Sequence, residues 1–388
     1  MKTIKLNRIF LIIIVGSLML NGVNGESDLG GVKDDSILKE NSYPILLSGL
    51  IWDIYIQGDL LFISRNNGEV EIYDNTNPTD IALIKTITCP KLSRLVAKED
   101  LLITGAYENG EICLIDISDP SFAEIIGRIV GNDPYNYMYD MCISGNYLFI
   151  ANYSKTVIYD ISNPEGVSKI ATYTSISPAM KIQVHGNLLF RYGGMHDKVE
   201  IVNITQINSP QFLRKIENES QQERVVEIVV KDDYLITFFS YYKAEVYDIK
   251  NPKIPALVDL GDLREYVECA TYYRNTTFVV DEYQVFLMDI TNPENIKTIG
   301  LINNTGRIYD VAANGEYLFC DFGEGYGVIS VDDAIDYEVI ENSPPERTPR
   351  PTINLELSGV IEGLSITIIV IIFQKILSEK RRKKRFEK

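Results

Sequence analysis

Short runs of hydrophobic residues, separated by polar turn residues, recur along most of the chain and predict β-strands rather than helices. The segment between residues 140 and 173 shows this unit most clearly. Its predicted strands cover residues 140–144, 147–151, 156–159 and 167–173. The dipeptide Gly145-Asn146 separates the first two strands and is typical of a two-residue hairpin turn, because glycine readily adopts a positive φ. The segment therefore predicts a four-stranded antiparallel sheet.

Two phrases of the sequence repeat in step seven times. The first, Val/Ile-Tyr/Met-Asp-Ile-Ser/Thr-Asn-Pro, ends the third strand of the unit. Its Asp or Asn occupies residues 74, 116, 160, 203, 248, 289 and 332. The second phrase carries the hairpin turn and begins at residues 58, 99, 145, 186, 232, 275 and 315. The interval of 41–45 residues between copies of the first phrase is that of a four-stranded propeller blade.

The repeat predicts an all-β fold, a seven-bladed β-propeller of four-stranded antiparallel blades over residues 43–342. In each blade we expect the Asp or Asn of the first phrase to bond to the local backbone and the Pro to fix φ. A flat sandwich is the alternative, but it would give no reason for a fixed period. Two segments are candidates for the strand that closes the ring, residues 43–48 and residues 337–340.

The two phrases resemble the repeats of the LVIVD-repeat family. The resemblance covers about residues 43–341 and is carried by the pattern "YLF(I/V)A … V(I/Y)DISNP", with residues 145–164 as the nearest copy. Blades four and seven depart from the pattern because they lack the Asn-Pro turn. The family is found on surface proteins of archaea and bacteria. The resemblance therefore implies a β-propeller at a cell surface, and it implies no reaction because none is assigned to the family.

The N-terminal residues 1–25 predict a secretory signal peptide. Lys2, Lys5 and Arg8 precede a hydrophobic run, and small residues precede the expected cleavage site after Gly25. Residues 26–42 would then form a linker to the propeller. No cysteine lies near the cleavage site, which argues against a lipoprotein anchor.

The C-terminal residues predict a membrane anchor. A Pro-rich stalk covers residues 343–354, a single transmembrane helix covers residues 355–378, and a basic cytoplasmic tail covers residues 379–388. Basic residues next to a membrane span stay on the cytoplasmic side, so we expect the N-terminus and the propeller on the extracytoplasmic side of the cell membrane. The helix is either retained as the anchor or removed by processing after export.

The charge of the chain bears on its partners. The formal net charge is −17, and the segment between the two basic ends is more acidic still. Phosphate binding requires positive charge, so nucleic acid is not an expected partner.

Five Asn-x-Ser/Thr sequences are candidate N-glycosylation sites on an exposed domain, at Asn152, Asn203, Asn218, Asn275 and Asn303. The five cysteines show no paired spacing, and we expect buried free thiols.

The chain contains no sequence motif of a hydrolase, a nucleotide-binding enzyme or an EF-hand. Charged residues recur instead five positions before the hairpin turns, where each innermost strand begins. In blade order this position reads Asp53, Arg94, Asp140, Lys181, Glu227, Ala270 and Asp310. The sign alternates from blade one to blade five, which predicts a charge ring of inter-blade ion pairs at the channel mouth.

The break in this alternation suggests a cation site. Asp310 and Asp53 are neighbours across the ring closure, and Ala270 beside them brings no charge. Two carboxylates without a basic partner could hold a metal ion, and Ca²⁺ is the cation that carboxylate oxygens favour. No other cofactor is expected.

Tyrosines predict a separate binding face. Tyr135, Tyr137 and Tyr139 lie in the long connection into blade three, where side chains are expected to be exposed. Tyrosine combines a large contact area with a polar tip, which suits recognition of a protein or a glycan.

These features favour a membrane-anchored cell-surface protein that binds an unknown protein or glycan ligand, as an adhesion or interaction scaffold rather than as an enzyme. The alternative is an extracytoplasmic hydrolase or lactonase of the propeller type, whose acidic residues at the channel mouth would act as a carboxylate pair. Convergent carboxylates around a metal would favour the hydrolase. A salt-bridged mouth beside an exposed Tyr-rich face would favour binding.

Overall fold

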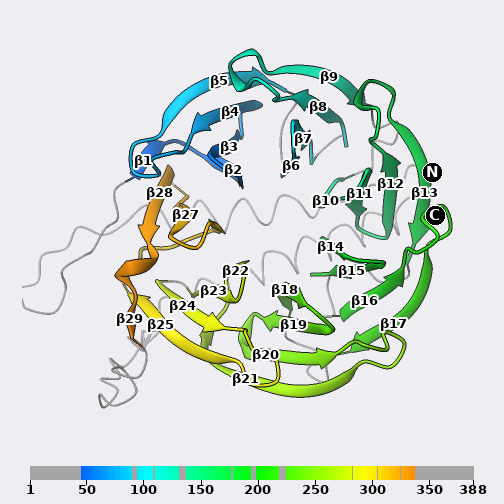
Figure 1. Cartoon of the computed structure of the whole chain (residues 1–388), viewed down its shortest axis with the longest axis vertical. Coiled ribbons are helices and arrows are strands. Elements are labelled where there is room, and N and C mark those ends of the chain that lie inside the picture. The colour runs from blue at the N-terminus through cyan, green and yellow to red at the C-terminus, as the bar shows by residue number, and fades with distance from the viewer. Residues whose placement is uncertain are drawn as a thin grey trace, which may run out of the picture. The chain divides into compact units, whose positions relative to one another are not determined.

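The computed structural model describes residues 45–336, with gaps at residues 90–93, 108–109, 131–136, 176–177, 194–197, 218–223, 282, 304 and 324. Side chains are described in these ranges except at residues 45, 198, 241–242, 260–266 and 336. The strands form seven sheets that surround a central channel as the blades of a propeller (Figure 1). The predicted all-β, seven-bladed propeller of four-stranded antiparallel blades is therefore confirmed.

The first four blades are each built from consecutive strands. Blade one contains β2 (Ile51–Gln57), β3 (Leu60–Arg65), β4 (Glu69–Asp74) and β5 (Ala82–Thr88). Blade two contains β6 (Arg94–Lys98), β7 (Leu101–Gly105), β8 (Ile112–Asp116) and β9 (Glu124–Ile129). Blade three contains β10 (Asp140–Ser144), β11 (Tyr147–Asn152), β12 (Lys155–Asp160) and β13 (Ser168–Thr174). Blade four contains β14 (Lys181–His185), β15 (Leu188–Tyr192), β16 (Lys198–Asn203) and β17 (Gln211–Glu217).

The last three blades follow the same order, with one exception in blade seven. Blade five contains β18 (Val225–Lys231), β19 (Tyr234–Phe239), β20 (Tyr241–Asp248) and β21 (Ala256–Tyr266). Blade six contains β22 (Cys269–Tyr273), β23 (Thr276–Asp281), β24 (Gln284–Asp289) and β25 (Lys297–Asn303), with the short β29 (Ile335–Asp336) beside β25. Blade seven contains β26 (Asp310–Ala313), β27 (Tyr317–Asp321), β28 (Gly325–Ser330) and β1 (Ile45–Ser48). Single-turn 3₁₀-helices are η1 (Pro120–Phe122), η2 (Pro164–Gly166) and η3 (Val331–Asp333).

The first strand of the described residues closes the ring. Strand β1 pairs antiparallel with β28, so that Ile45 lies opposite Gly327 and Ser48 opposite Gly325. Figure 1 shows this contact as the blue start of the described chain beside its orange end. Of the two segments predicted to supply the closing strand, the N-terminal one therefore does so. The other, residues 337–340, lies outside the described residues.

The inner hairpins have the predicted two-residue turns in blades one to six. Ser144 pairs with Tyr147 across Gly145, whose φ is +57°. In blade six the same left-handed position is held by Arg274, at φ +55°, and not by Asn275, with which the second phrase was expected to begin. The predicted register of blade six was thus wrong by one residue. Counted from Arg274, the inner strand begins with Cys269, so Cys269 and not Ala270 occupies the position of the charge ring.

In blades one to six the Asp or Asn of the first phrase forms a side-chain-stabilised turn beside the inner hairpin. In blade seven the equivalent residue, opposite Tyr317, is Ser330 and not the predicted Asp332, and the Ser330 hydroxyl accepts the N–H of Asp332 at 3.2 Å. In blade three the Asp160 carboxylate accepts the N–H of Ser162 at 2.9 Å, as expected for an Asx turn. The N–H of the intervening Ile161 donates to the carbonyl of Asn146 in the hairpin turn at 2.8 Å. The buried Ile161 side chain closes the end of the core. Equivalent backbone bonds start at Asn75, Ile117, Ile204, Ile249, Ile290 and Val331.

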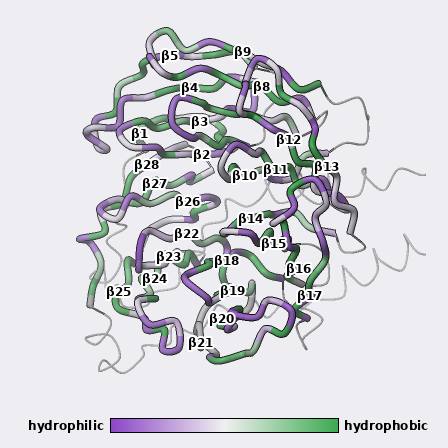
Figure 2. The backbone as a smooth tube through the Cα atoms, turned by 45° about the vertical axis from the view of Figure 1, so that its right-hand side comes forward, coloured by the Kyte–Doolittle hydropathy of each residue, from purple (hydrophilic) through white to green (hydrophobic). Residues whose placement is uncertain are grey.

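Among the described residues, the core consists of seven hydrophobic clusters, one between each pair of neighbouring blades. The cluster between blades one and two, for example, contains Phe62 and Ile72 of the first and Leu102 and Ile115 of the second. The middle strands are covered by a blade on each side, so consecutive residues such as Leu148 and Phe149 are both fully buried. Hydrophobic segments accordingly run through the blades (Figure 2). Each repeat of the sequence thus forms one blade, and neighbouring blades stack through these clusters.

The predicted ends of the chain lie outside the described residues. This applies to the signal peptide (1–25), the linker (26–42), the stalk (343–354), the transmembrane helix (355–378) and the basic tail (379–388). Within the part of the chain that the structure describes, no helix has the length and hydrophobicity needed to cross a membrane.

Candidate functional site

The central channel is narrowed by side chains from the start of the seven inner strands. We call the end of the channel at which these strands begin the upper face, and the end with their hairpin turns the lower face. In each blade, the residue five positions before the hairpin turn lies at this narrowing, and these seven residues form a ring. This waist ring consists of Asp53, Arg94, Asp140, Lys181, Glu227, Cys269 and Asp310. A cavity opens on each side of it, and Arg94 lines both cavities.

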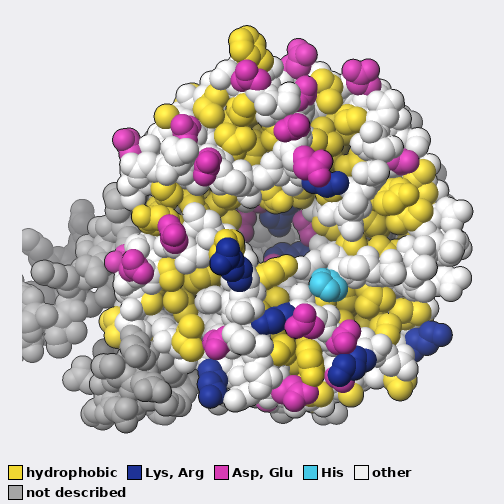
Figure 3. All heavy atoms as spheres, in the orientation of Figure 1, with side chains coloured by type: hydrophobic (Ala, Val, Ile, Leu, Met, Phe, Trp, Pro, Cys, Tyr) yellow, Lys and Arg dark blue, Asp and Glu magenta, His cyan; other side chains and the backbone are white. Residues whose placement is uncertain are grey.

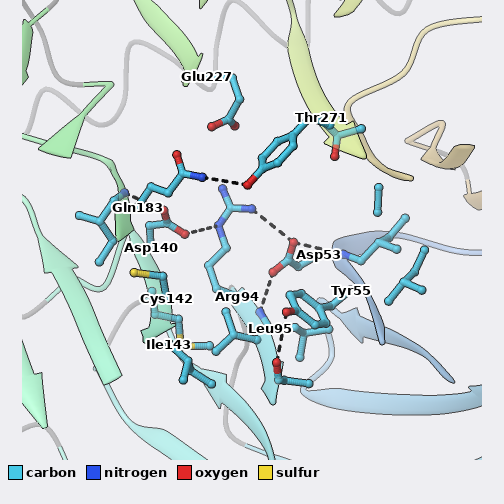
Figure 4. Close-up of a pocket in the computed structure, with 18 of the residues that line it drawn as sticks. Asp53, Tyr55, Arg94, Leu95, Asp140, Cys142, Ile143, Gln183, Glu227 and Thr271 are labelled. Carbon is cyan, nitrogen blue, oxygen red and sulfur yellow. Dashed lines mark hydrogen bonds and ion pairs between the residues drawn. The ribbon is translucent and has the colours of Figure 1, made fainter. Parts of the chain in front are cut away.

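Arg94 is the central cation of the waist ring. Its Nη1 lies 3.3 Å from Asp53 Oδ1 and 3.9 Å from Asp310 Oδ2, and its Nε lies 3.9 Å from Asp140 Oδ1. Figure 4 shows the guanidinium between Asp53 and Asp140, with its interactions drawn as dashed lines. One side chain from blade two thus joins carboxylates of blades one, three and seven.

Two acidic residues of the ring also bond to the backbone of the next blade. Asp53 Oδ2 accepts the N–H of Leu95 at 2.6 Å, and Asp140 Oδ2 accepts the N–H of Ile182 at 2.9 Å. Both donors are the second residue of an inner strand. The two carboxylates therefore connect blade one to blade two and blade three to blade four.

A second ion pair joins blades four and five. Lys181 Nζ lies 2.7 Å from Glu227 Oε2, and the hydroxyl of Tyr192 donates to the other oxygen of the same carboxylate. Glu227 Oε1 also accepts the N–H of Ile228 at 3.0 Å. The six charged residues were predicted to ring the channel mouth; they lie instead at the waist, between the two cavities, and each contacts a partner.

Burial of the ring shifts its pKa values. Burial raises the pKa of Asp53 to about 8; Arg94 opposes this rise, and the neighbouring Asp310 and Asp140 add to it. Burial likewise raises the pKa of Asp140. For Arg94, burial alone would lower the pKa, but the three facing carboxylates raise it above its ordinary value. Arg94 therefore keeps its positive charge, which holds the acidic side chains around it.

The contacts of Arg94 bear on the predicted metal site. The sequence argument treated Asp53 and Asp310 as unpaired, although Arg94 lies in the blade next to Asp53, and it did not foresee that Arg94 also reaches Asp310 two blades away. In the structure both carboxylates face the Arg94 guanidinium. Among the described residues, no group of three or more His, Cys, Asp or Glu side chains is arranged to hold a metal ion.

The lower cavity has a volume of about 730 Å³ and ends at the waist ring. Tyr55 and Tyr272 lie in its wall, and both have bonded hydroxyls. Tyr55 donates to the carbonyl of Ala97 at 3.2 Å, and Gln183 Nε2 donates to the Tyr272 hydroxyl at 3.4 Å. The space-filling view shows the hollow centre of the ring, with basic and acidic side chains inside it (Figure 3).

The upper cavity has a volume of about 410 Å³ and a different lining. The residue directly before the waist ring is aromatic in three blades, and these residues form what we call the aromatic collar. The collar consists of Trp52, Tyr139 and Tyr309, from blades one, three and seven. Trp52 is 45% exposed and Tyr309 is 54% exposed. Large aromatic side chains that stay accessible at the opening of a cavity are typical of a binding surface.

Neighbouring tyrosines support one side of the collar. The Tyr139 ring lies 5.4 Å from that of Tyr107 and 5.9 Å from that of Tyr153, measured between ring centroids. Tyr107 also contacts Tyr137 at 5.3 Å. The structure thus brings together Tyr137 and Tyr139, two of the three tyrosines predicted as a binding face. Tyr135, the third, lies outside the described residues.

Tyr309 is held by two other contacts. The Arg307 guanidinium carbon lies 5.0 Å from the centroid of its ring, as in a cation–π contact. On the blade-seven turn, Gly323 leaves room for the ring, because a Cβ at that glycine would lie 2.6 Å from Tyr309 Cε2. Arg307 is itself paired with Glu268 at 3.2 Å.

Sequence reasoning missed three of these aromatic residues, Trp52, Tyr107 and Tyr309. A signal for two of them was present, because Trp52 and Tyr309 occupy the repeat position just before the charged residue that was identified. Reading that one position through all blades would have found the collar. Tyr107 lies in a connection outside the repeated phrases, so its contact with Tyr139 depends on the fold.

The predicted glycosylation sites and cysteines have defined positions. Four of the sequons begin at or beside strand ends, at Asn152, Asn203, Asn275 and Asn303, and Asn218 lies outside the described residues. The side-chain oxygens of Asn203, Asn275 and Asn303 each accept a hydrogen bond. All five cysteines are free thiols, and all but Cys142 are buried.

Comparison with known proteins bears on the fold. The LVIVD repeat family model matches residues 106–129 and 137–174, which lie in blades two and three. No curated protein matches the sequence.

Solved structures of similar fold include three propeller-sized chains. The crystal structure of the computationally designed Ika8 protein has 10% identity and a TM-score of 0.55, over 75% of this chain and 98% of that one. Sqt1 of Saccharomyces cerevisiae has 9% identity and a TM-score of 0.56, over 75% and 98%. A functionally unknown protein from Desulfotomaculum acetoxidans DSM 771 has 11% identity and a TM-score of 0.61, over 72% and 94%. Likeness at such identity concerns the fold alone. Together, the matched repeats and the seven blades show that the chain is a β-propeller that contains LVIVD repeats.

Proposed function

We propose that this protein is a membrane-anchored cell-surface binding protein that receives its ligand at the upper face of the propeller, in adhesion or as an interaction scaffold. The observation that carries the proposal is the aromatic collar, which opens to solvent directly above the ion pairs of the waist ring. An exposed aromatic surface above charged side chains that are already paired offers contact area for a ligand.

The state of the waist carboxylates favours binding over hydrolysis. Two-carboxylate hydrolysis needs one acid and one base that both reach the substrate. Asp53 and Asp140 accept backbone N–H groups and face Arg94, and Glu227 is paired with Lys181. These acidic side chains already have structural partners, so the arrangement supports a ligand-binding site better than the alternative hydrolase or lactonase.

The location rests on the sequence. A signal peptide at residues 1–25 would export the propeller, and the span at residues 355–378 followed by the basic tail would keep it attached with its N-terminus outside. Candidate glycosylation sites on the propeller agree with an extracytoplasmic position. The stalk at residues 343–354 would hold the propeller away from the membrane.

The test uses cells that display the full-length chain. Immobilised cell-envelope material is offered to them untreated, after protease treatment, and after periodate oxidation of its glycans. Displaying cells should be retained on untreated material, and the double variant Trp52→Ala, Tyr309→Ala should lose most of this retention. Tyr283→Ala serves as the control, because Tyr283 is equally exposed at 54% but lies outside the collar.

Two results would contradict the proposal. If cells displaying the double variant and cells displaying the original chain were retained equally, the collar would not contribute to binding. Resistance of the propeller to protease added to intact cells, with digestion only after the cells are opened, would contradict the extracytoplasmic location.

A further inference from the structure

The charges around the upper cavity balance. Its lining includes three acidic residues, Glu268, Asp310 and Asp321, and three basic residues, Arg94, Lys181 and Arg224. Several of these are paired at short range, as in the contacts of Arg94 with Asp310 and of Glu268 with Arg307. A lining with equal numbers of acidic and basic side chains does not by itself favour an ionic ligand of either sign. Its charged groups can still donate and accept hydrogen bonds with a neutral, hydroxyl-rich molecule.

Two side chains of the collar are held in place before any ligand arrives. Tyr139 packs against Tyr107 and Tyr153, and Tyr309 packs against the Arg307 guanidinium and Gly323. Tyr153 itself has a φ of +40°, a conformation that bulky residues rarely adopt, and its carbonyl accepts bonds from Ala179 N–H and Arg191 Nη2. Such strain persists only where the surroundings enforce it. Aromatic side chains fixed in advance bind with little loss of conformational entropy.

We infer that the upper cavity binds an uncharged carbohydrate ring, with the aromatic collar stacking against its apolar face and the balanced charges bonding its hydroxyls. The inference rests on the proposed function, because it assigns a ligand class to the same site. A pyranose has one face of C–H groups, which packs on the electron-rich face of an aromatic ring, and a rim of hydroxyls. The volume of about 410 Å³ is within the range of small-molecule sites and suits one or two sugar rings.

A cationic ligand is the chemistry most easily confused with this one, because aromatic cages also bind quaternary ammonium groups. Two observations favour the neutral sugar. The balanced lining lacks the excess negative charge that would attract a cation. One face of Tyr309 is already covered by the Arg307 guanidinium, so the collar holds a cation of its own.

The chain provides a direct reporter for the test, because Trp52 is its only tryptophan. Full-length protein, purified in a detergent without a sugar headgroup, is titrated while tryptophan emission is recorded. The probes are the methyl glycosides of glucose, galactose, mannose and N-acetylglucosamine, the corresponding disaccharides, and tetramethylammonium chloride. At least one saccharide should shift the emission to shorter wavelength and saturate. Tetramethylammonium should leave the emission unchanged.

Variants identify the site. Tyr139→Ala and Tyr309→Ala should each raise the Kd of the responding saccharide at least tenfold, and Gly323→Ala should raise it by displacing the Tyr309 ring. Tyr283→Ala should leave it unchanged, which separates a local effect from general damage. Circular dichroism and the Tm of each variant exclude unfolding as the cause.

The outcomes separate this inference from the proposed function. If no saccharide shifts the emission while displaying cells still depend on the collar for retention, the carbohydrate inference fails and the binding function stands. Saturation by tetramethylammonium alone would also overturn the inference. If saccharides bind and the collar variants still bind them with unchanged Kd, the carbohydrate site lies elsewhere and the inference is wrong. If neither retention nor a spectral response depends on the collar, both proposals fail.

Discussion

Arg94 Nη1 of blade two lies 3.3 Å from Asp53 Oδ1 of blade one, and the same blade-two strand donates the Leu95 N–H to the other Asp53 oxygen at 2.6 Å. A side chain and a backbone group of neighbouring residues therefore hold one carboxylate from two directions. Because Arg94 also reaches Asp140 and Asp310, its guanidinium connects four of the seven blades. The waist ring therefore has a structural role, because it connects neighbouring blades.

Replacement of Arg94 tests that role. Arg94→Met removes the cation and leaves three carboxylates facing one another, so we expect a loss of about 2 kcal/mol in the free energy of unfolding. Denaturant unfolding followed by circular dichroism measures the loss. Arg128→Met is the control, because Arg128 pairs with Glu111 at the surface and such a pair contributes less than about 1 kcal/mol. Equal losses in the two variants would contradict a special role for the waist.

The raised pKa values of the ring predict the direction of the pH dependence. A carboxyl group with a raised pKa in the folded state stabilises the fold fully below its unfolded pKa, and this contribution disappears as pH rises through the folded pKa. For Asp53 the window runs from the ordinary value of 3.8 to about 8. Asp140 and Asp321 are raised by burial and act in the same direction. We therefore expect the Tm to fall between pH 4 and pH 8.

Asp53→Asn identifies the source of this slope. The variant cannot ionise at residue 53, so its Tm should change less than that of the original chain across the same window. Turn residues such as Asp116 and Asp160 have lowered pKa values, because bonds from Ser118 and Ser162 favour the ionised form. Their stabilisation is complete above about pH 4 and is lost only in more acidic solution. Scanning calorimetry over the window measures both slopes, and parallel slopes would refute the assignment to Asp53.

The repeat made most of the fold predictable. Each phrase corresponds to a local interaction that depends on residue type, as in the Asp160–Ser162 turn, so seven copies predict seven blades. The closing strand was ambiguous because a strand of four residues at a chain end has no repeat neighbour to define its partner. The register of blade six was predicted wrongly because Arg274 adopts a positive φ that glycine adopts in blades one, three and four.

The candidate site was less predictable, because it depends on the length of side chains and on contacts between segments far apart in the sequence. Position in the repeat places a residue at a level of the channel, and all six charged residues of the ring were found in this way. It does not say how far a side chain extends, and Arg94 contacts Asp310 beyond the neighbouring blade. The Tyr107–Tyr139 contact depends on two connections meeting at the upper face, which no local pattern encodes.

Closure of the ring by β1 can be tested with one substitution. Leu47 packs against the cluster between blades seven and one, so Leu47→Asp should lower the free energy of unfolding by about 2 kcal/mol. Leu50→Asp is the matched control, because Leu50 is 64% exposed and follows the strand. Urea unfolding compares the two variants. If they lose the same small amount, β1 does not close the ring.

Blade one departs from the repeat at a buried position, and this departure predicts a stabilising substitution. Asn75 stands where blades two to six have a buried isoleucine; it is 4% exposed, and its Oδ1 has no partner among the described residues. Its backbone N–H donates to the carbonyl of Asp59, a bond that any residue type keeps. Asn75→Ile should therefore remove a buried polar group, add apolar contact, and raise the free energy of unfolding by about 1 kcal/mol. The reverse change Ile161→Asn in blade three should lower it by about 2 kcal/mol, since it buries a polar group where the repeat has none. Chemical denaturation of both variants measures the pair, and a destabilising Asn75→Ile would mean that the asparagine side chain has a role in blade one that its buried position does not reveal.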